Sequence, residues 1–261
     1  MTKIPLALAL SLALVGCSNS DSQNNTKDVS NEKQEIVEKE PVAKEKEEKV
    51  DLTQLLPTEL EKDLHYQGMA EFGYGLKVHH VQEMDGVTFL SYKGWFEDGM
   101  GGEPEKRGFY IDYLISKDEI YQQIKNVDTA QDKHRSTISS IIPHQIVLQA
   151  PLKEGHSWTQ EFLYIPDEIY TLENVSKEPH YLTAAHTITD IDDNNGKPIY
   201  TVETVVEGVE GYYNEVYKET KKWETGKGLI SFESTIPMFD GMPEDDPESI
   251  LTFGYGISEW E

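Results

Sequence analysis

The densest group of chemically active side chains in this sequence is an acidic segment near the C-terminus. Five carboxylates are separated there by only a few residues and two prolines: Asp240, Glu244, Asp245, Asp246 and Glu248. Carboxylate oxygens are the ligands that hard divalent cations prefer. We interpret the segment as a solvated loop whose charges repel one another, and we expect no cofactor. The alternative is an open divalent-cation site formed by these five carboxylates.

A second acidic run begins like a calcium-binding loop. Asp190-x-Asp192-x-Asn194 has the spacing of the first ligands, but the glycine that such a loop needs at its sixth position is displaced to Gly196. The twelfth position is Thr201, where a glutamate is required. The Asn195-Gly196 pair lies between two alternating apolar runs, which is a strong hairpin signal. A plain hairpin turn therefore explains this run better than a calcium site does.

Histidines and tryptophans provide weaker candidates. His79 and His80 point to opposite faces of a strand, so they cannot share a metal without a bulge. His180 and His186 share a strand face but lie about 20 Å apart. We expect these side chains to lie on the surface or to be hydrogen-bonded in the core. The tryptophans could line a groove for a sugar or an apolar ligand, but their period-two spacing favours core packing; they are Trp95, Trp158, Trp223 and Trp260.

Common catalytic motifs are missing from the sequence. It contains no phosphate-binding loop, dinucleotide-binding glycine pattern, nucleophile elbow or zinc-protease helix motif. Paired carboxylates of the glycosidase type carry no weight, because the 39 acidic residues after position 50 make pairs inevitable. We therefore expect no catalytic residues, and we keep a carboxylate-dependent cell-wall hydrolase as the alternative.

The only cysteine lies at the end of a short apolar run. Lys3 precedes an apolar run of 12 residues from 4 to 15, which is too short to span a hydrocarbon core of about 30 Å but typical of a signal peptide. Leu14-Val15-Gly16-Cys17 resembles the lipobox of bacterial lipoproteins. This resemblance covers about 17 residues and implies cleavage after Gly16 and a diacylglycerol on Cys17, with further acylation by a fatty acid such as palmitate. An ordinary signal peptide with a chance cysteine is the alternative.

The charge of the chain divides unevenly between three regions. The 261 residues carry a formal net charge of −25, of which the signal segment 1–16 contributes +1 and residues 17–50 contribute −3. Residues 51–261 carry the remaining −23 and all of the tryptophan and tyrosine. Residues 17–50 predict a disordered Glu/Lys-rich tether, and residues 51–261 a folded domain. Such acidity argues against nucleic-acid partners.

The elements that must position these side chains are mostly strands. The segment from Leu52 to Leu64 predicts a short helix, and 126–140 stays undecided between helix and strand. Period-two patterns predict strands over 72–81, 87–96, 109–115, 119–124, 145–149, 157–165, 180–191, 198–206, 212–223, 229–234 and 250–255. We therefore expect a mainly β fold, with α+β as the alternative: a single antiparallel, curved or partly closed sheet of about ten strands with one or two short helices.

A four-residue sequence occurs twice, and a longer one resembles other proteins. We interpret Phe72-Gly73-Tyr74-Gly75 and Phe253-Gly254-Tyr255-Gly256 as turns and strand edges. Pro151-Leu152-Lys153-x-Gly155-x-x-Trp158, followed later by Gly228-Leu229-Ile230, resembles a pattern in uncharacterised β-rich extracytoplasmic lipoproteins of Gram-positive bacteria. The match spans roughly residues 108–235, and Lys221-Lys222-Trp223 departs from the pattern. The resemblance implies an envelope location and an antiparallel domain, but no activity.

Taken together, these features predict a lipoprotein anchored through Cys17 on the extracytoplasmic face of the cell membrane. We expect its domain to be a non-enzymatic binding module, with an envelope protein, an apolar ligand or a wall polymer as its partner. The alternatives are the hydrolase and a divalent-cation-binding envelope protein.

Overall fold

The computed structural model describes residues 51–60, 62–68, 73–96, 108–126, 140–142, 144–166, 178–238 and 250–258. The chain divides into two compact units, Met1–Lys46 and Glu47–Glu261, and all described residues belong to the second. Cys17, the segment 127–139 and Trp260 therefore lie outside the described residues.

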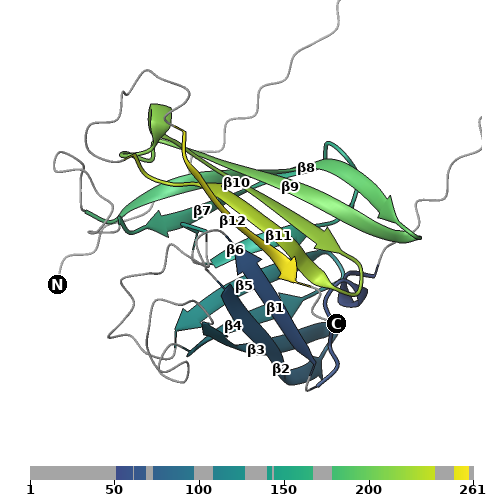
Figure 1. The fold of residues 1–261 in the computed structure, drawn as a ribbon. Coiled ribbons are helices and arrows are strands. Elements are labelled where there is room, and N and C mark those ends of the chain that lie inside the picture. Colours follow the sequence, from purple (N-terminus) through teal and green to yellow (C-terminus); the bar gives the residue numbers. More distant parts are fainter. Residues whose placement is uncertain are drawn as a thin grey trace, which may run out of the picture. The chain divides into compact units, whose positions relative to one another are not determined.

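The described residues form one antiparallel sheet of twelve strands (Figure 1). Its order is β6-β5-β4-β3-β2-β1-β12-β11-β10-β9-β8-β7, so the sheet curves until its two edge strands, β6 and β7, approach each other. The strands are β1 Asp63–Gly68, β2 Gly73–Met84, β3 Val87–Phe96, β4 Gly108–Ile115, β5 Glu119–Asn126, β6 His144–Gln149, β7 Ser157–Tyr164, β8 His180–Asn194, β9 Lys197–Glu207, β10 Val216–Glu224, β11 Gly228–Thr235 and β12 Thr252–Ser258. The predicted mainly β fold with a nearly closed sheet is confirmed.

The helix predicted over residues 52–64 is wrong. Only the 3-10 turn η1 (Leu52–Gln54) forms, and β1 begins at Asp63. The hydroxyl of Tyr92 donates to the carbonyl of Pro57 at 2.6 Å, which holds the segment after the turn against the sheet. Leu64 and Tyr66 then alternate with exposed positions along β1, so burial in the sheet overrides local helix propensity.

The hairpin predicted from Asn195-Gly196 is confirmed, and a hairpin of the same kind joins β2 to β3. Asp85 and Gly86 connect β2 to β3 with φ values of 47° and 83°. Asn195 and Gly196 connect β8 to β9 with φ values of 54° and 82°. Such positive φ values at both central residues match the right-handed twist of the flanking strands. Asp190 and its acidic neighbours are part of β8, so they belong to a strand and hairpin rather than to a calcium loop.

The repeated Gly-Tyr-Gly sequences, 73–75 and 254–256, lie in strands rather than in turns, and Gly73 begins its strand. Phe72 lies outside the described residues. The two sequences fall on β2 and β12, the two strands that flank β1. This arrangement brings Tyr74 and Tyr255 together with Tyr66 of β1, with ring centroids 4.5–6.0 Å apart. All three rings are buried in the largest core cluster. A Cβ added to Gly75 would overlap the Trp95 ring, so this glycine permits close packing.

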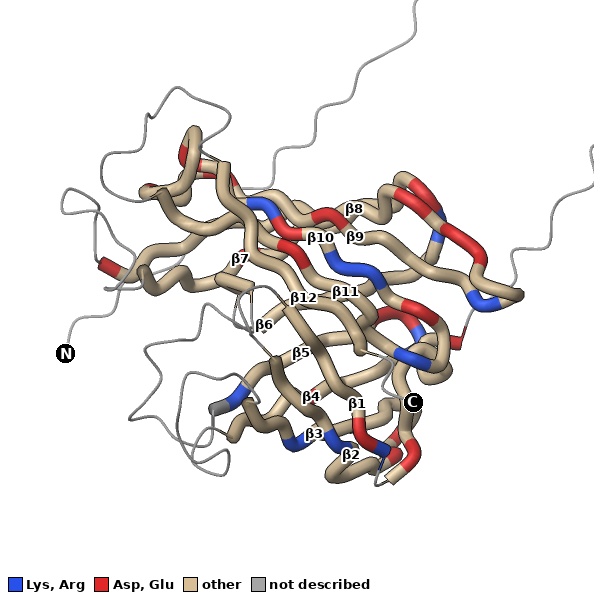
Figure 2. The backbone as a smooth tube through the Cα atoms, in the orientation of Figure 1, with Lys and Arg blue, Asp and Glu red and all other residues tan. Residues whose placement is uncertain are grey.

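Charge is distributed unevenly over the sheet (Figure 2). Strands β8–β11 carry eight acidic and four basic residues, whereas β2–β5 carry three of each. The acidic excess of the described strands therefore lies on the β8–β11 side of the sheet.

Candidate functional site: a buried polar network

Polar side chains form a continuous row on the inner face of β7–β10. The strand register places Trp158 opposite His186, His186 opposite Thr204, and Thr204 opposite Glu219. Because side chains alternate between the two faces of a strand, these four residues point to the same side. Each side chain is buried, with an exposed fraction between 1% and 6%. A row of polar side chains therefore crosses an otherwise apolar part of the core.

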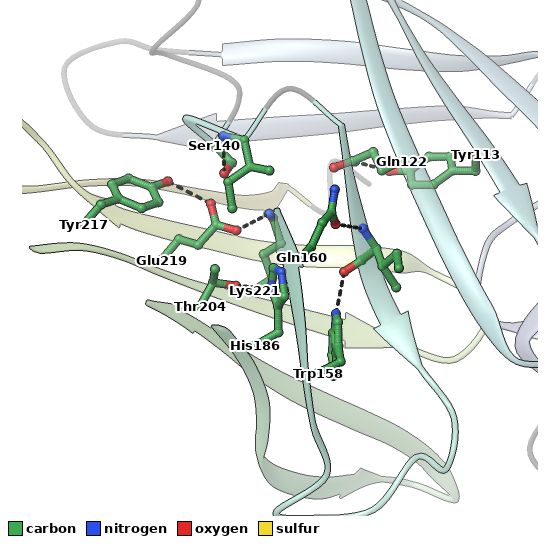
Figure 3. A network of polar contacts seen from close by, with 12 residues as sticks. Tyr113, Gln122, Ser140, Trp158, Gln160, His186, Thr204, Tyr217, Glu219 and Lys221 are labelled. Atoms are coloured by element: carbon green, nitrogen blue, oxygen red, sulfur yellow. Dashed lines mark hydrogen bonds and ion pairs between the residues drawn. The ribbon is translucent and has the colours of Figure 1, made fainter. Parts of the chain in front are cut away.

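Glu219 is the centre of the network (Figure 3). Its carboxylate accepts a hydrogen bond from the hydroxyl of Tyr217 at 2.7 Å and another from the Lys221 ammonium at 2.6 Å. The Lys221 and Glu219 side chains are 5% and 0% exposed. The Lys221 Nζ atom also lies 5.5 Å from the centre of the Phe232 ring, within reach of a cation–π contact. Two successive inward-facing positions of β10 thus supply a buried, hydrogen-bonded ion pair.

Burial and pairing act in opposite directions on these two groups. Burial alone would raise the pKa of Glu219, but Lys221 and the hydroxyls of Ser140 and Tyr217 outweigh it and lower the pKa below its ordinary value. Burial lowers the pKa of Lys221, and Glu219 offsets part of that effect. Glu219 is therefore ionised and acts as an acceptor, which makes it a poor proton donor at neutral pH.

His186 extends the network toward β7. Its Nδ1 atom lies 2.9 Å from the hydroxyl oxygen of Thr204, at hydrogen-bond distance. Its buried Nε2 atom has no hydrogen-bond partner among the described residues. The imidazole stacks on Trp158 at 5.1 Å, and Trp158 in turn stacks on His156 at 5.8 Å. Burial lowers the pKa of His186 to about 4; the charge of Lys221 acts in the same direction, and that of Glu219 acts against it. The ring is therefore neutral at physiological pH.

Side chains rather than backbone pairing join the two edge strands. The Gln160 carboxamide on β7 accepts from the Ile146 backbone N–H at 2.8 Å and donates to the His144 carbonyl at 2.6 Å. The Trp158 indole N–H donates to the Ile146 carbonyl at 3.1 Å. Gln160 thus makes the two hydrogen bonds to β6 that a neighbouring peptide group would otherwise make.

Replacing Gln160 with leucine is expected to lower the free energy of unfolding by about 1 kcal/mol, because the part-buried Ile146 N–H loses its partner while the exposed His144 carbonyl is hydrated instead. Urea unfolding followed by tryptophan fluorescence would measure the change. Glu161→Leu, at the neighbouring exposed position of β7, is the control. Equal stability of the Gln160→Leu and Glu161→Leu proteins would contradict a role in joining the edges.

The interior beside the ion pair is nearly filled by side chains. A small cavity there is lined by four tyrosines, four aliphatic side chains and Phe232, together with Gln122, Ser140 and Lys221. It has room for about one water molecule. Tyr113 accepts a hydrogen bond from Gln122 at 2.8 Å, and burial raises its pKa. The arrangement can hold a charge pair and a water molecule, but it has no space for a larger ligand.

The candidate residues identified from the sequence differ in whether the structure describes them and in how deeply they are buried. The cation-site candidates in the segment 240–248 lie outside the described residues, as does Cys17. Trp223 is fully buried and Trp158 nearly so, in agreement with core packing, whereas Trp95 is half-buried on the outer face. In the described part of the chain, no group of three or more His, Cys, Asp or Glu side chains could hold a metal ion.

His79 and His80 do not point to opposite faces. A bulge interrupts the β2–β3 register between Val78 and His80, so both histidines lie on the outer face. The His79 ring contacts Tyr110 at 5.5 Å, and the His80 ring contacts Phe89 at 5.9 Å. Both imidazoles are therefore in contact with aromatic rings of neighbouring strands.

Sequence reasoning missed the buried ion pair, although the strand pattern contained a signal. Residues 217, 219, 221 and 223 alternate with exposed or half-exposed positions along β10. Tyr217 and Trp223 are large aromatic residues separated by an even number of positions, so both side chains point to the same face, and their size indicates that this face is buried. Glu219 and Lys221 lie between them at the same two-residue spacing, so they point into the core as well. Lys221 belongs to the run that departs from the lipoprotein pattern.

Comparison with known proteins assigns no family to this chain. No family model matches it, and no curated protein matches it. It is similar to a solved structure from Bacteroides fragilis NCTC 9343, described as an exported protein with a YmcC-like fold, at 7% identity and a TM-score of 0.39, covering 78% of this chain and 96% of that one. It is also similar to a structure from Parabacteroides distasonis ATCC 8503, described as a lipoprotein, at 10% identity and a TM-score of 0.40, covering 80% and 98%. At such low identity and TM-score, these likenesses assign neither family nor function.

Proposed function

We propose that the protein is a lipoprotein anchored through Cys17 on the extracytoplasmic face of the cell membrane, where its β domain acts as a non-enzymatic binding module. The observation that carries the anchor is a coincidence of three features: a 12-residue apolar run, a lipobox-like Leu14-Val15-Gly16 and the only cysteine of the chain. No helix among the described residues is long and apolar enough to cross a membrane.

The close packing around the buried ion pair supports a module that binds through its outer surface. The ion pair of Glu219 and Lys221 is enclosed by side chains, and the adjacent cavity has room for about one water molecule. A ligand of ordinary size needs a pocket of about 300 Å³ or more. The outer faces of the strands, by contrast, present several large apolar side chains to solvent, among them Met84, Leu114 and Tyr181.

Replacing Cys17 with alanine is expected to abolish incorporation of labelled palmitate and the partitioning of the protein with membranes. Without the thiol there is no attachment point for the diacylglycerol, and stable anchoring requires the acyl chains. Metabolic labelling and membrane fractionation of cells that express the full chain would measure both effects. Ser18→Ala changes the neighbouring residue and should retain label and anchor. A Cys17→Ala protein that still takes up palmitate would overturn the proposal.

A further inference from the structure

The outer face of β2–β5 contains a row of lysines. The register places Lys77 opposite Lys93, Lys93 opposite Tyr110, and Tyr110 opposite Lys125. Asp63 of β1 lies at the end of the row, opposite Lys77. Like charges in directly opposed positions are unfavourable in a sheet. The direct opposition of Lys77 and Lys93 is therefore not explained by the stability of the sheet alone.

The exposed charge of this row is predominantly positive. Asp112, the acidic residue next to it, is only 8% exposed. Its carboxylate accepts from the Lys125 ammonium and from the Ser91 hydroxyl, both at 2.6 Å. The Lys125 side chain remains 51% exposed, and Lys93 is exposed. Lys93 and the partly exposed Lys125 therefore present positive charge to solvent, while the carboxylate that pairs with Lys125 is covered.

An apolar row runs beside the lysines on the same face. The register places Phe89 opposite Leu114 and Leu114 opposite Tyr121. Leu114 is 44% exposed and lines an open hollow with Val87 and Tyr121. Ser116 and the carboxylate-bearing Glu119 line the same hollow. Met84, which pairs with Val87, is 49% exposed. Four residues of strand separate this row from the lysines, about 13 Å.

We propose that this outer face of β2–β5, termed the docking face, lies against the anionic lipid surface to which the chain is anchored. Lysines attract acidic head groups, and exposed apolar and aromatic side chains enter the boundary between head groups and acyl chains. The acidic excess of β8–β11 does not oppose this contact strongly. Six strand positions of about 4.8 Å each separate β3 from β9 along the sheet, more than the Debye length of about 8 Å.

This inference rests on the proposed anchor, because the anchor keeps the lipid surface within reach. A solvated tether of the 34 residues from 17 to 50 spans about 30 Å on average. Binding of the docking face is then intramolecular and needs only modest intrinsic affinity.

A fluorescent label at position 114 would test the docking face. Because the native cysteine is lipidated, Leu114→Cys provides a single free thiol for an environment-sensitive dye. The full-length protein would be mixed with excess phosphatidylcholine vesicles with or without phosphatidylglycerol. We expect the emission to shift to the blue and brighten only when phosphatidylglycerol is present. Thr183→Cys, an exposed position on β8, is the matched labelled control and should not respond.

Charge reversal provides the second variant. Lys93→Glu is expected to lower the ratio of docked to undocked protein at least about fivefold, since each lysine near an anionic surface contributes about that factor. Lys218→Glu, at an exposed position of β10, should leave the ratio unchanged. Equal responses from dyes at 114 and 183, or no response at 114, would overturn the proposal. The same response to soluble polyphosphate without vesicles would also overturn it, because the partner would then be a polyanion and not a lipid surface.

Flotation of the same samples separates this test from that of the anchor. If the protein floats with the vesicles but the dye at 114 does not respond, the anchor is supported and the docking face is contradicted. If the protein does not float stably but its dye responds to phosphatidylglycerol, the anchor is contradicted and the docking face is supported.

Discussion

Lys221→Met is expected to lower the free energy of unfolding by about 3–5 kcal/mol, because it leaves the buried Glu219 carboxylate without its opposite charge. The Tyr217 hydroxyl would remain as a donor to that carboxylate, but a neutral hydrogen bond does not replace an ion pair in a low-dielectric interior. The lysine stem is matched in volume by methionine, so little of the loss would come from a cavity. Urea unfolding of the full chain, followed by the fluorescence of the buried Trp223, would measure it.

The double variant Glu219→Gln/Lys221→Met distinguishes the lost charge pair from a general packing defect. Glutamine still accepts from Tyr217 but carries no charge, so the double variant should be more stable than Lys221→Met alone. Lys117→Met removes one partner of the exposed ion pair with Asp118, whose side chains are 87% and 71% exposed, and should have little effect. A double variant less stable than either single variant would contradict the account of the ion pair.

The second large effect is a loss of stability in mild acid through His186. Its pKa is about 4 in the folded protein, against 6.5 for an unperturbed histidine such as that of the unfolded chain. The unfolded state therefore binds the proton first as the pH falls. The stabilisation is fully present above pH 6.5 and is lost progressively down to the folded pKa. Between about pH 7 and pH 5 the free energy of unfolding should fall by roughly 2 kcal/mol through this group alone.

His186→Gln should flatten the pH dependence over that range, because glutamine does not titrate. Urea unfolding at several values of pH would measure it. His180→Gln, on the same face of β8 but half-buried, is the matched control and should keep the slope of the unmodified protein. Restricting the range to about pH 5 and above avoids the titration of Glu219, whose lowered pKa affects stability only in stronger acid. An unchanged slope in His186→Gln would show that the ring is not buried in its neutral form.

The proposed docking face alters what the net negative charge of the domain implies about its position relative to the membrane. From composition alone, a net charge of −23 on residues 51–261 predicts repulsion from anionic lipid, relieved only by bridging cations. In the fold, β2–β5 carry as many basic as acidic residues, and the exposed charge of one row is positive. If the domain docks as proposed, it does so through the side where its acidic excess is smallest.

The local pattern of the sequence was enough to predict most of the strands, because alternation and turn chemistry act between residues close in the chain. The Asn195-Gly196 turn and the strand 87–96 were predicted with the correct bounds. The lipobox-like segment around Cys17 is likewise local, and it stays a prediction from the sequence. The helix predicted over 52–64 failed because Leu52, Leu55 and Leu56 are buried against strands that are distant in the chain.

Only the tertiary structure decided what the interior and the outer face contain. Glu219 meets Lys221 within one strand, but their burial depends on strands β7–β9 and on Ser140, which the sequence places far away. The lysine row joins four strands through their register, and a shift of one residue would turn each side chain to the opposite face. Periodicity determines which residues alternate along a strand; the pairing of distant strands determines which of them meet.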